Sequence, residues 1–181
     1  MRIGDDLYFA PRIRFCDVDL DGPELPEQFR CRMAGFYLEP AEQCAQGDHA
    51  FAAGVLLVTC IDALARLRYG GRVGARFKRF AREDLQSFPD DDLAERFYCE
   101  FRNGLVHEGR LKKGACFSLD AGATVEELGG ILLVNPKHLA TEARSALDAY
   151  IALVTLDDVE RRKLAGALKI DLEDDLRLAG A

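Results

Sequence analysis

The longest apolar run of the chain, Ala50–Ile61, is the feature that most limits how the chain can fold. It opens a predicted helix over Phe51–Tyr69 that is almost wholly apolar in its first half and basic in its second, and two glycines then end it. A helix with apolar residues on every side has to be buried. Because the run stops at Asp62, it is too short to span a bilayer. We therefore expect a buried central helix and no membrane segment.

Apolar residues at helical spacing predict further helices on both sides of this one. The expected helices are Glu24–Glu39, a short piece up to Gln46, Val73–Leu85, Asp90–Gly109, a helix opened by Asn135 and Pro136, and Val159–Leu168. Pro40 is expected to end or kink the first of them.

Two stretches do not follow the helical pattern. Residues 1–22 are expected to be an extended lead-in with at most a short edge strand, because Pro11 interrupts them. Within residues 114–135, the runs Ala115–Leu119 and Gly130–Val134 predict a small β-hairpin. No linker or repeat divides the chain, so we expect one mainly α domain over residues 1–181, a helical bundle with a β-hairpin insertion.

The net charge, the cysteine spacing and the absence of binding motifs argue against several kinds of binding site. A formal net charge of −7 argues against a whole surface built for nucleic acid, although it leaves room for a local basic site. The six cysteines form no C-x-x-C pair, so we expect reduced and mostly buried thiols and no metal site. The acidic stretch Asp17–Gly22 matches only the start of a calcium loop and is interpreted as a solvated turn. No nucleotide-cofactor fingerprint is present, and we expect no cofactor.

The stretch Asp90–Gly109, called the motif helix below, carries the best functional signal. Its aspartates provide an N-cap and Gly109 a stop. Successive residues of an α-helix are about 100° apart, so apolar residues three or four positions apart fall on one side, which is expected to face the core. That side carries Leu93, Phe97, Phe101 and Leu105. Arg102, Asn103 and His107 fall on the other side, and Gly104 leaves room for the close approach of another backbone.

These three polar residue types together suit metal-independent cleavage of RNA. Arg102 is expected to bind phosphate and the transition state, because its guanidinium keeps its charge. His107 is expected to move the proton while a 2′-hydroxyl attacks the adjacent phosphate. Asn103 is expected to position a hydroxyl or a phosphate oxygen.

The run Arg102-Asn103-Gly104-Leu105-Val106-His107 resembles the hallmark of the HEPN domain family, R-x(4–6)-H with a polar residue often following the arginine. The resemblance extends from about Pro23 to Leu111 and over the helix after Pro136; the hairpin is not part of the minimal domain. It implies an all-α bundle that forms a homodimer through the motif helix, so that two motif helices face each other and build a composite ribonuclease site. Many such proteins are RNases of toxin–antitoxin, phage-defence or RNA-processing systems, which implies an antitoxin or regulatory partner, and others are non-catalytic.

Three alternatives remain at the motif. Arg102 and His107 can be a surface pair at a helix end, with Arg102 bound to Glu95 or Asp62 and His107 favoured by the C-terminal end of the helix dipole. The protein can also be a non-catalytic interaction protein that binds RNA or nucleotides, or a helical scaffold whose motif helix only dimerises.

A basic segment, Ala63–Arg82, contains no acid and is the second candidate site. Its arginines and lysine alternate with aromatic residues, a composition that favours an RNA phosphate backbone as much as it favours a solvated helix face. The phosphate-binding residues predicted from this segment and from the cations after the motif are Arg72, Arg76, Lys78, Arg79, Arg110 and Lys112. With no apolar export signal visible after Met1, we expect a cytoplasmic location.

Overall fold

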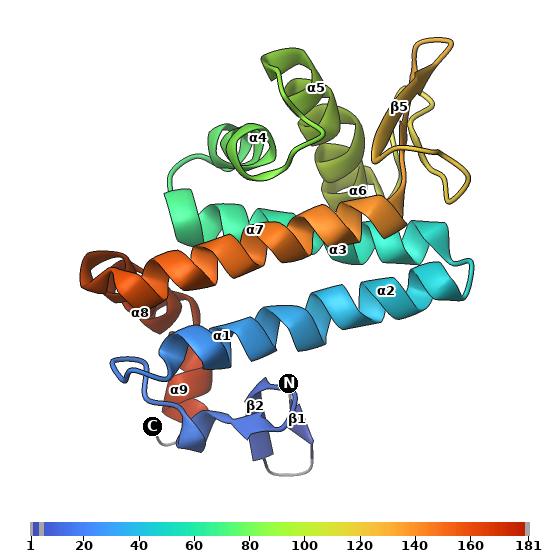
Figure 1. Cartoon of the computed structure of the whole chain (residues 1–181). Helices are drawn as coiled ribbons and strands as arrows, with labels where there is room; N and C mark the ends of the chain where they lie inside the picture. Colours follow the sequence, from blue (N-terminus) through green and yellow to red (C-terminus); the bar gives the residue numbers. More distant parts are fainter. Residues whose placement is uncertain (1, 4–5, 180–181) are drawn as a thin grey trace. The chain divides into compact units, whose positions relative to one another are not determined.

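The computed structural model describes residues 2–3 and 6–179, and it is mainly helical, as predicted (Figure 1). The chain forms two compact units. The first comprises Met1–Phe36 and Leu147–Ala181, and the second comprises Tyr37–Ala146.

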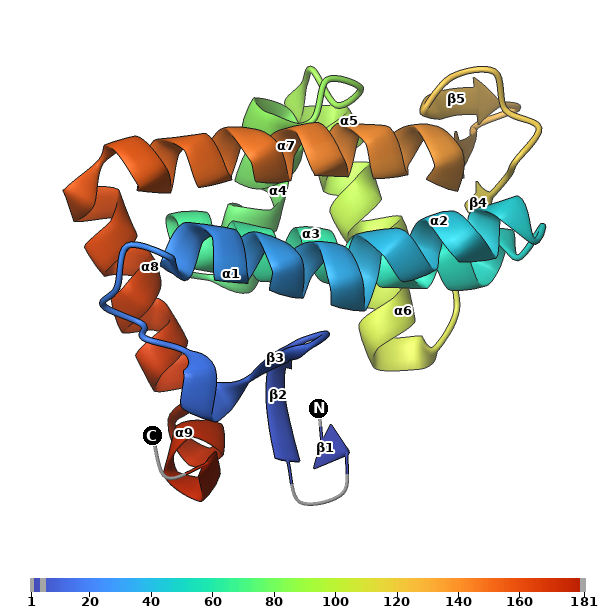
Figure 2. The same cartoon turned by 60° about the horizontal axis from the view of Figure 1, so that its bottom comes forward.

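The first unit begins with a small antiparallel sheet, where the sequence predicted an extended lead-in with at most one edge strand (Figure 2). Its strands, in spatial order, are β1 (Arg2–Ile3), β2 (Asp6–Ala10) and β3 (Ile13–Arg14). Pro11 does not interrupt a strand, because it lies in the turn between β2 and β3, which Arg12 closes with a φ of 69°. A short 3₁₀ turn, η1 (Phe15–Asp17), follows, and the Phe15 ring packs edge-on against Phe9 at 5.7 Å.

All but the last helix of the first unit agree with the predicted pattern. The helices of this unit are α1 (Leu25–Met33), the C-terminal part of α7 (Pro136–Leu156), α8 (Asp158–Asp171) and α9 (Glu173–Ala179). Asp157 caps α8, because its Oδ1 accepts the backbone N–H of Val159 at 2.7 Å. The acidic tail, for which no helix was predicted, forms α9.

A π-helical segment, η2 (Ala34–Leu38), follows α1 and precedes α2 (Glu39–Gln46). The ring of Pro40 would clash with the carbonyl of Phe36, four residues earlier, in a regular α-helix. The wider π turn lies at this place, so the chain stays helical where an end or a kink was predicted.

The second unit is built on α3 (Ala50–Tyr69), which confirms the predicted central helix. Its buried residues are Ala53, Gly54, Leu57, Val58, Cys60, Ile61, Leu64 and Ala65. The helix α2 runs along one side of α3 (Figure 1), and α4 (Val73–Asp84) and the motif helix also pack on it. Phe77, Phe80 and Ala81 of α4 are buried, as predicted.

Within the described residues, α3 is the one helix long and apolar enough to cross a membrane. The expectation of a segment too short for a bilayer rested on Ala50–Ile61, whereas the helix continues to Tyr69. Length and composition are weak evidence that α3 spans a membrane, because the core helix of a soluble protein has the same properties.

The β insertion of the second unit has three strands instead of the predicted two. They are β4 (Cys116–Phe117), β5 (Val125–Leu128) and β6 (Ile131–Val134), in the spatial order β4-β6-β5. The two predicted runs do pair, but in parallel. The hairpin is instead β5–β6, closed by Gly129 and Gly130 with φ values of 58° and 81°. The sequence V-E-E-L of β5 lacks strand-like alternation, whereas Gly-Gly was an available hairpin signal.

The small sheet is attached to α3 by the close approach of Phe117 to Gly54. A Cβ atom placed on Gly54 would lie 2.3 Å from the Phe117 ring. We therefore expect Gly54→Ala to lower the free energy of unfolding by about 1–3 kcal/mol, the usual cost of overpacking. The matched control is Gly166→Ala within α8, where an added Cβ has nothing within 4 Å. This control should raise stability by about 0.5–1 kcal/mol, because alanine favours the helix. Urea titrations followed by circular dichroism would measure both, and equal effects would contradict the close-packing argument.

None of the six cysteines, all within the described residues, forms a disulfide, but the expectation that most are buried is wrong. Cys60 is buried, and burial raises the pKa of its thiol to about 12. Cys16 is exposed, and the remaining four are partly exposed.

Candidate functional site

The motif helix is helical over its whole length, but its middle part is a π-helix. It consists of α5 (Asp91–Arg96), the π-helical segment η3 (Phe97–Arg102) and α6 (Asn103–Glu108), and Figure 1 shows it beside α4. The π-helical segment ends at Arg102, the first residue of the predicted motif. Such turns are frequent at functional sites.

Both predicted ends of the motif helix are confirmed. The Asp90 carboxylate accepts the backbone N–H of Leu93 at 2.9 Å, and Gly109 ends α6 in the left-handed region with a φ of 65°. Gly104 does make room for a close backbone. A Cβ there would lie 2.3 Å from the carbonyl oxygen of Arg110, in the chain's own turn after α6.

The core side of the motif helix is only partly the predicted one. Phe97 and Phe101 are fully buried, whereas Leu93 and Leu105 are partly exposed. Ala94, Glu100 and Gly104 are buried instead. A π turn contains more residues than an α turn, so the step of about 100° per residue does not hold across η3.

Arg102 lies against the central helix. Its Nε and one terminal nitrogen donate to Oδ2 of Asp62 at 3.2 and 2.8 Å, and its side chain is 12% exposed. The alternative pairing with Asp62 is thus confirmed, whereas Glu95 pairs with Lys78 at 2.5 Å. The other terminal nitrogen of Arg102 lies 3.5 Å from Oδ1 of Asn103, so these two motif residues are in contact.

Arg76 of α4 approaches the same carboxylate. A terminal nitrogen of Arg76 lies 3.9 Å from Oδ1 of Asp62, and its side chain is 14% exposed. Another nitrogen donates to the carbonyl of Gly71 at 3.2 Å. Among the described residues, Oδ1 of Asp62 and Nε of Arg76 are buried without a hydrogen-bond partner. The structure thus joins two residues predicted for different roles, Arg102 and Arg76, in one cluster of two cations and one anion.

His107 lies apart from this cluster, in the last turn of α6. Its side chain is exposed, and within the described residues it has no hydrogen bond or ion pair. The preceding Val106 is 58% exposed. A single chain therefore presents a free imidazole at the helix end and does not bring it into contact with Arg102.

The basic segment meets acids from its surroundings. Lys78 pairs with Glu95 of α5, and this hydrogen bond raises the pKa of Lys78 and lowers that of Glu95. Arg79 pairs with Glu83 at 3.0 Å and stacks on the Tyr69 ring at 4.1 Å. Much of the predicted positive charge of this segment is therefore balanced, by residues that lie outside it in the sequence.

Of the remaining predicted phosphate ligands, two are paired with an acid and one is not. Arg110 and Lys112 both pair with Glu108, at 2.6 and 2.7 Å, and the hydrogen bond from Lys112 is the main cause that lowers the pKa of Glu108. Arg72 is exposed at the start of α4, and no ion pair or hydrogen bond of its side chain occurs among the described residues.

An open groove of about 330 Å³ lies beside α4 and the start of α5. It is lined by Ala75, Lys78, Arg79, Arg82, Glu83 and Asp91. Arg82 forms an ion pair with Asp91 across it. Three cations against two acids make this groove mildly basic.

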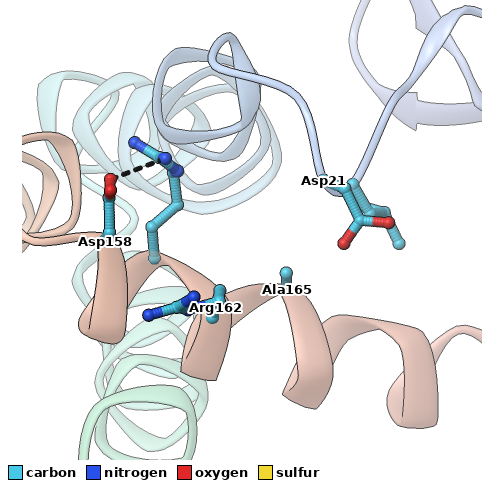
Figure 3. Close-up of a pocket in the computed structure, with 6 residues that line it drawn as sticks. Asp21, Asp158, Arg162 and Ala165 are labelled. Atoms are coloured by element: carbon cyan, nitrogen blue, oxygen red, sulfur yellow. Dashed lines mark ion pairs between the residues drawn. The ribbon is translucent and has the colours of Figure 1, made fainter.

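A second cavity, of about 230 Å³, belongs to the first unit and contains none of the predicted site residues. Figure 3 shows Arg162 and Ala165 on α8, with Asp21 on the loop that faces them. Arg161 pairs with Asp158 at 2.7 Å, and Asp21 is bound by Lys169 at 2.6 Å. Its lining carries two cations and two anions, so the formal charges of the lining balance.

Glu100 is a residue that sequence reasoning missed. Its side chain is 2% exposed within η3. Its Oε1 accepts from Arg96 at 3.1 Å, whereas Oε2 is buried with no partner among the described residues. Arg96 also binds Glu127 and the carbonyl of Gly130, both at 2.9 Å, and so ties the motif helix to the β5–β6 hairpin. The only available signal was an acid directly before the core residue Phe101.

Metal ligands do not cluster in the part of the chain that the structure describes, since no group of three or more His, Cys, Asp and Glu side chains could hold a metal ion there. Comparisons of this chain with protein-family models, with curated proteins and with solved structures found no match.

Proposed function

We propose that this chain is a HEPN-like protein that cleaves RNA without a metal ion, acting as a homodimer through its motif helix. The observation that carries the proposal is the free, exposed imidazole of His107, five positions after an arginine on the same helix. A histidine that no protein group occupies is available to take and return a proton.

The roles follow from the chemistry of each group. His107 takes the proton of a 2′-hydroxyl as its oxygen attacks the adjacent phosphorus, the bond from phosphorus to the 5′ oxygen breaks, and that oxygen receives a proton. Arg102 neutralises the charge that develops on the phosphate. Asn103, in contact with Arg102, positions the phosphate. The products are a 2′,3′-cyclic phosphate and a 5′-hydroxyl.

A dimer would place two motif helices around one RNA strand. In one chain, His107 is exposed and Arg102 lies against Asp62, so the two groups do not form a complete site. The exposed Val106 beside His107 supplies apolar surface for a contact between α6 helices. A second copy would bring a second imidazole to this surface.

The second candidate is a non-catalytic HEPN-like protein that binds RNA or nucleotides, or a regulatory partner such as an antitoxin. The specific observation in its favour is that the Arg102 guanidinium, the proposed transition-state ligand, is already paired with Asp62 and has no contact with His107. Binding through the backbone phosphates needs no proton transfer.

Turnover separates the two candidates. With labelled single-stranded RNAs in excess over protein, and with EDTA present, the ribonuclease is expected to yield more product than protein, with cyclic-phosphate ends. Arg102→Ala is expected to lower this rate by about 10²–10³-fold, the usual cost of losing one donor to a developing negative charge. Saturable RNA binding without product in the wild-type protein would instead establish the binding function.

A further inference from the structure

The cluster of Asp62, Arg76 and Arg102 is an imperfect ion pair of the kind an incoming anion can replace. Arginine and carboxylate usually pair through two parallel hydrogen bonds to the two oxygens. Here both donors of Arg102 go to Oδ2, while Oδ1 has no hydrogen bond among the described residues. The second cation, Arg76, stays at 3.9 Å and keeps its buried Nε–H unused.

The charge of the cluster also favours an anion. Two guanidinium groups and one carboxylate leave a formal charge of +1, on side chains that are 12–21% exposed. Charges that are partly removed from water are screened less than charges on an open surface. The three side chains come from α3, α4 and η3, which pack together in the second unit, so the cations are held at fixed positions.

We propose that Asp62 occupies a phosphate-binding position formed by Arg76 and Arg102, and that a phosphate group of RNA displaces it. A tetrahedral phosphate offers more acceptor oxygens than the carboxylate, and can meet the fork of Arg102 and the Nε–H of Arg76 together. The Asp62 side chain, 21% exposed, has access to solvent when it leaves. Asp62 is then an internal competitor that limits phosphate binding at the site. This deepens the proposed function, since it takes Arg102 as the phosphate ligand.

The test is a calorimetric titration with inorganic phosphate at constant ionic strength, which measures the Kd for phosphate. Asp62→Asn keeps the size of the side chain and raises the charge of the cluster to +2. We expect it to lower the Kd for phosphate about tenfold. Arg76→Gln and Arg102→Gln are each expected to raise the Kd about tenfold or more. The control Arg162→Gln removes an exposed cation of the first unit, which has no partner among the described residues, and should change the Kd less than twofold.

A measurement on the wild-type protein does not depend on how the variants fold. In ¹⁵N spectra, phosphate should shift the Nε–H signals of Arg76 and Arg102, and chloride at equal ionic strength should not. Unchanged signals, or a Kd that stays the same or rises in Asp62→Asn, would overturn the proposal and leave Asp62 as a residue that only positions Arg102.

Two further binding experiments separate this proposal from the ribonuclease proposal. A 2′-O-methyl oligoribonucleotide carries phosphodiesters but no 2′-hydroxyl to attack, so its tighter binding to Asp62→Asn reports displacement without cleavage. If only inorganic phosphate binds more tightly, the site takes free phosphate and RNA displacement is excluded. His107→Gln should bind phosphate like wild type. These measurements can therefore show displacement of Asp62 without cleavage of RNA, and they can also show cleavage without displacement.

Discussion

Phe97→Ala is expected to lower the free energy of unfolding by about 3–5 kcal/mol, the largest stability effect that the structure suggests. The Phe97 side chain is fully buried, and its ring lies within 5.5 Å of three others. It stacks on Phe88 at 4.4 Å and contacts Phe77 and Phe101 at 5.3 and 5.5 Å. Truncation removes these ring pairs and leaves a cavity between α4 and η3.

Urea denaturation of the whole chain, followed by circular dichroism, would measure the loss. The matched control is Phe51→Ala, a phenylalanine of the same unit that is 52% exposed and contacts one ring, Phe117. It should cost no more than about 1.5 kcal/mol. If the two variants lose the same stability, the aromatic cluster does not hold the motif helix in place. Since Phe97 and Arg102 are the first and last residues of η3, such a result would also weaken the case for a fixed Arg102.

The helices could be predicted because their signals are local. Asp90 and Gly109 mark the ends of the motif helix with side-chain chemistry that acts within one turn, and the structure uses both as predicted. The buried central helix followed from composition alone, because no other arrangement covers such a run.

What the sequence could not predict depends on contacts between distant residues or on a change of helical period. The π turn η3 alters which side of the motif helix is buried, so Glu100 lies inside and Leu105 is partly exposed. Strand β5 forms because Gly129 and Gly130 fold it onto β6, although its own residues do not alternate.

The candidate site was predicted as a set of residues but not as an arrangement. Arg102 and Asp62 lie 40 positions apart, and spacing along one helix gave no means to choose between Asp62 and Glu95 as the partner. The segment Ala63–Arg82 lacks acids in sequence, yet acids of α3 and α5 contact it in space. Local composition therefore overstated its free positive charge.

His107→Gln is the substitution with the largest expected effect on activity. General acid–base catalysis by a positioned histidine contributes about 10²–10⁴-fold to a rate, so cleavage of single-stranded RNA should fall by about this factor. Because the side chain is exposed and has no partner among the described residues, the free energy of unfolding should change by less than about 0.5 kcal/mol. Single-turnover cleavage with EDTA present would measure the chemical step.

The control for this variant is His138→Gln, which changes another exposed histidine of the second unit, near the start of α7. It should cleave RNA at the wild-type rate. Glutamine keeps hydrogen-bonding groups but cannot take up a proton near neutral pH, so it separates proton transfer from binding. If His107→Gln cleaves RNA as fast as His138→Gln, then His107 moves no proton and the proposed catalytic role is wrong. The non-catalytic function predicts instead that the wild-type protein and both variants bind RNA and cleave none. In that second case the exposed end of α6 is a surface for RNA or a partner.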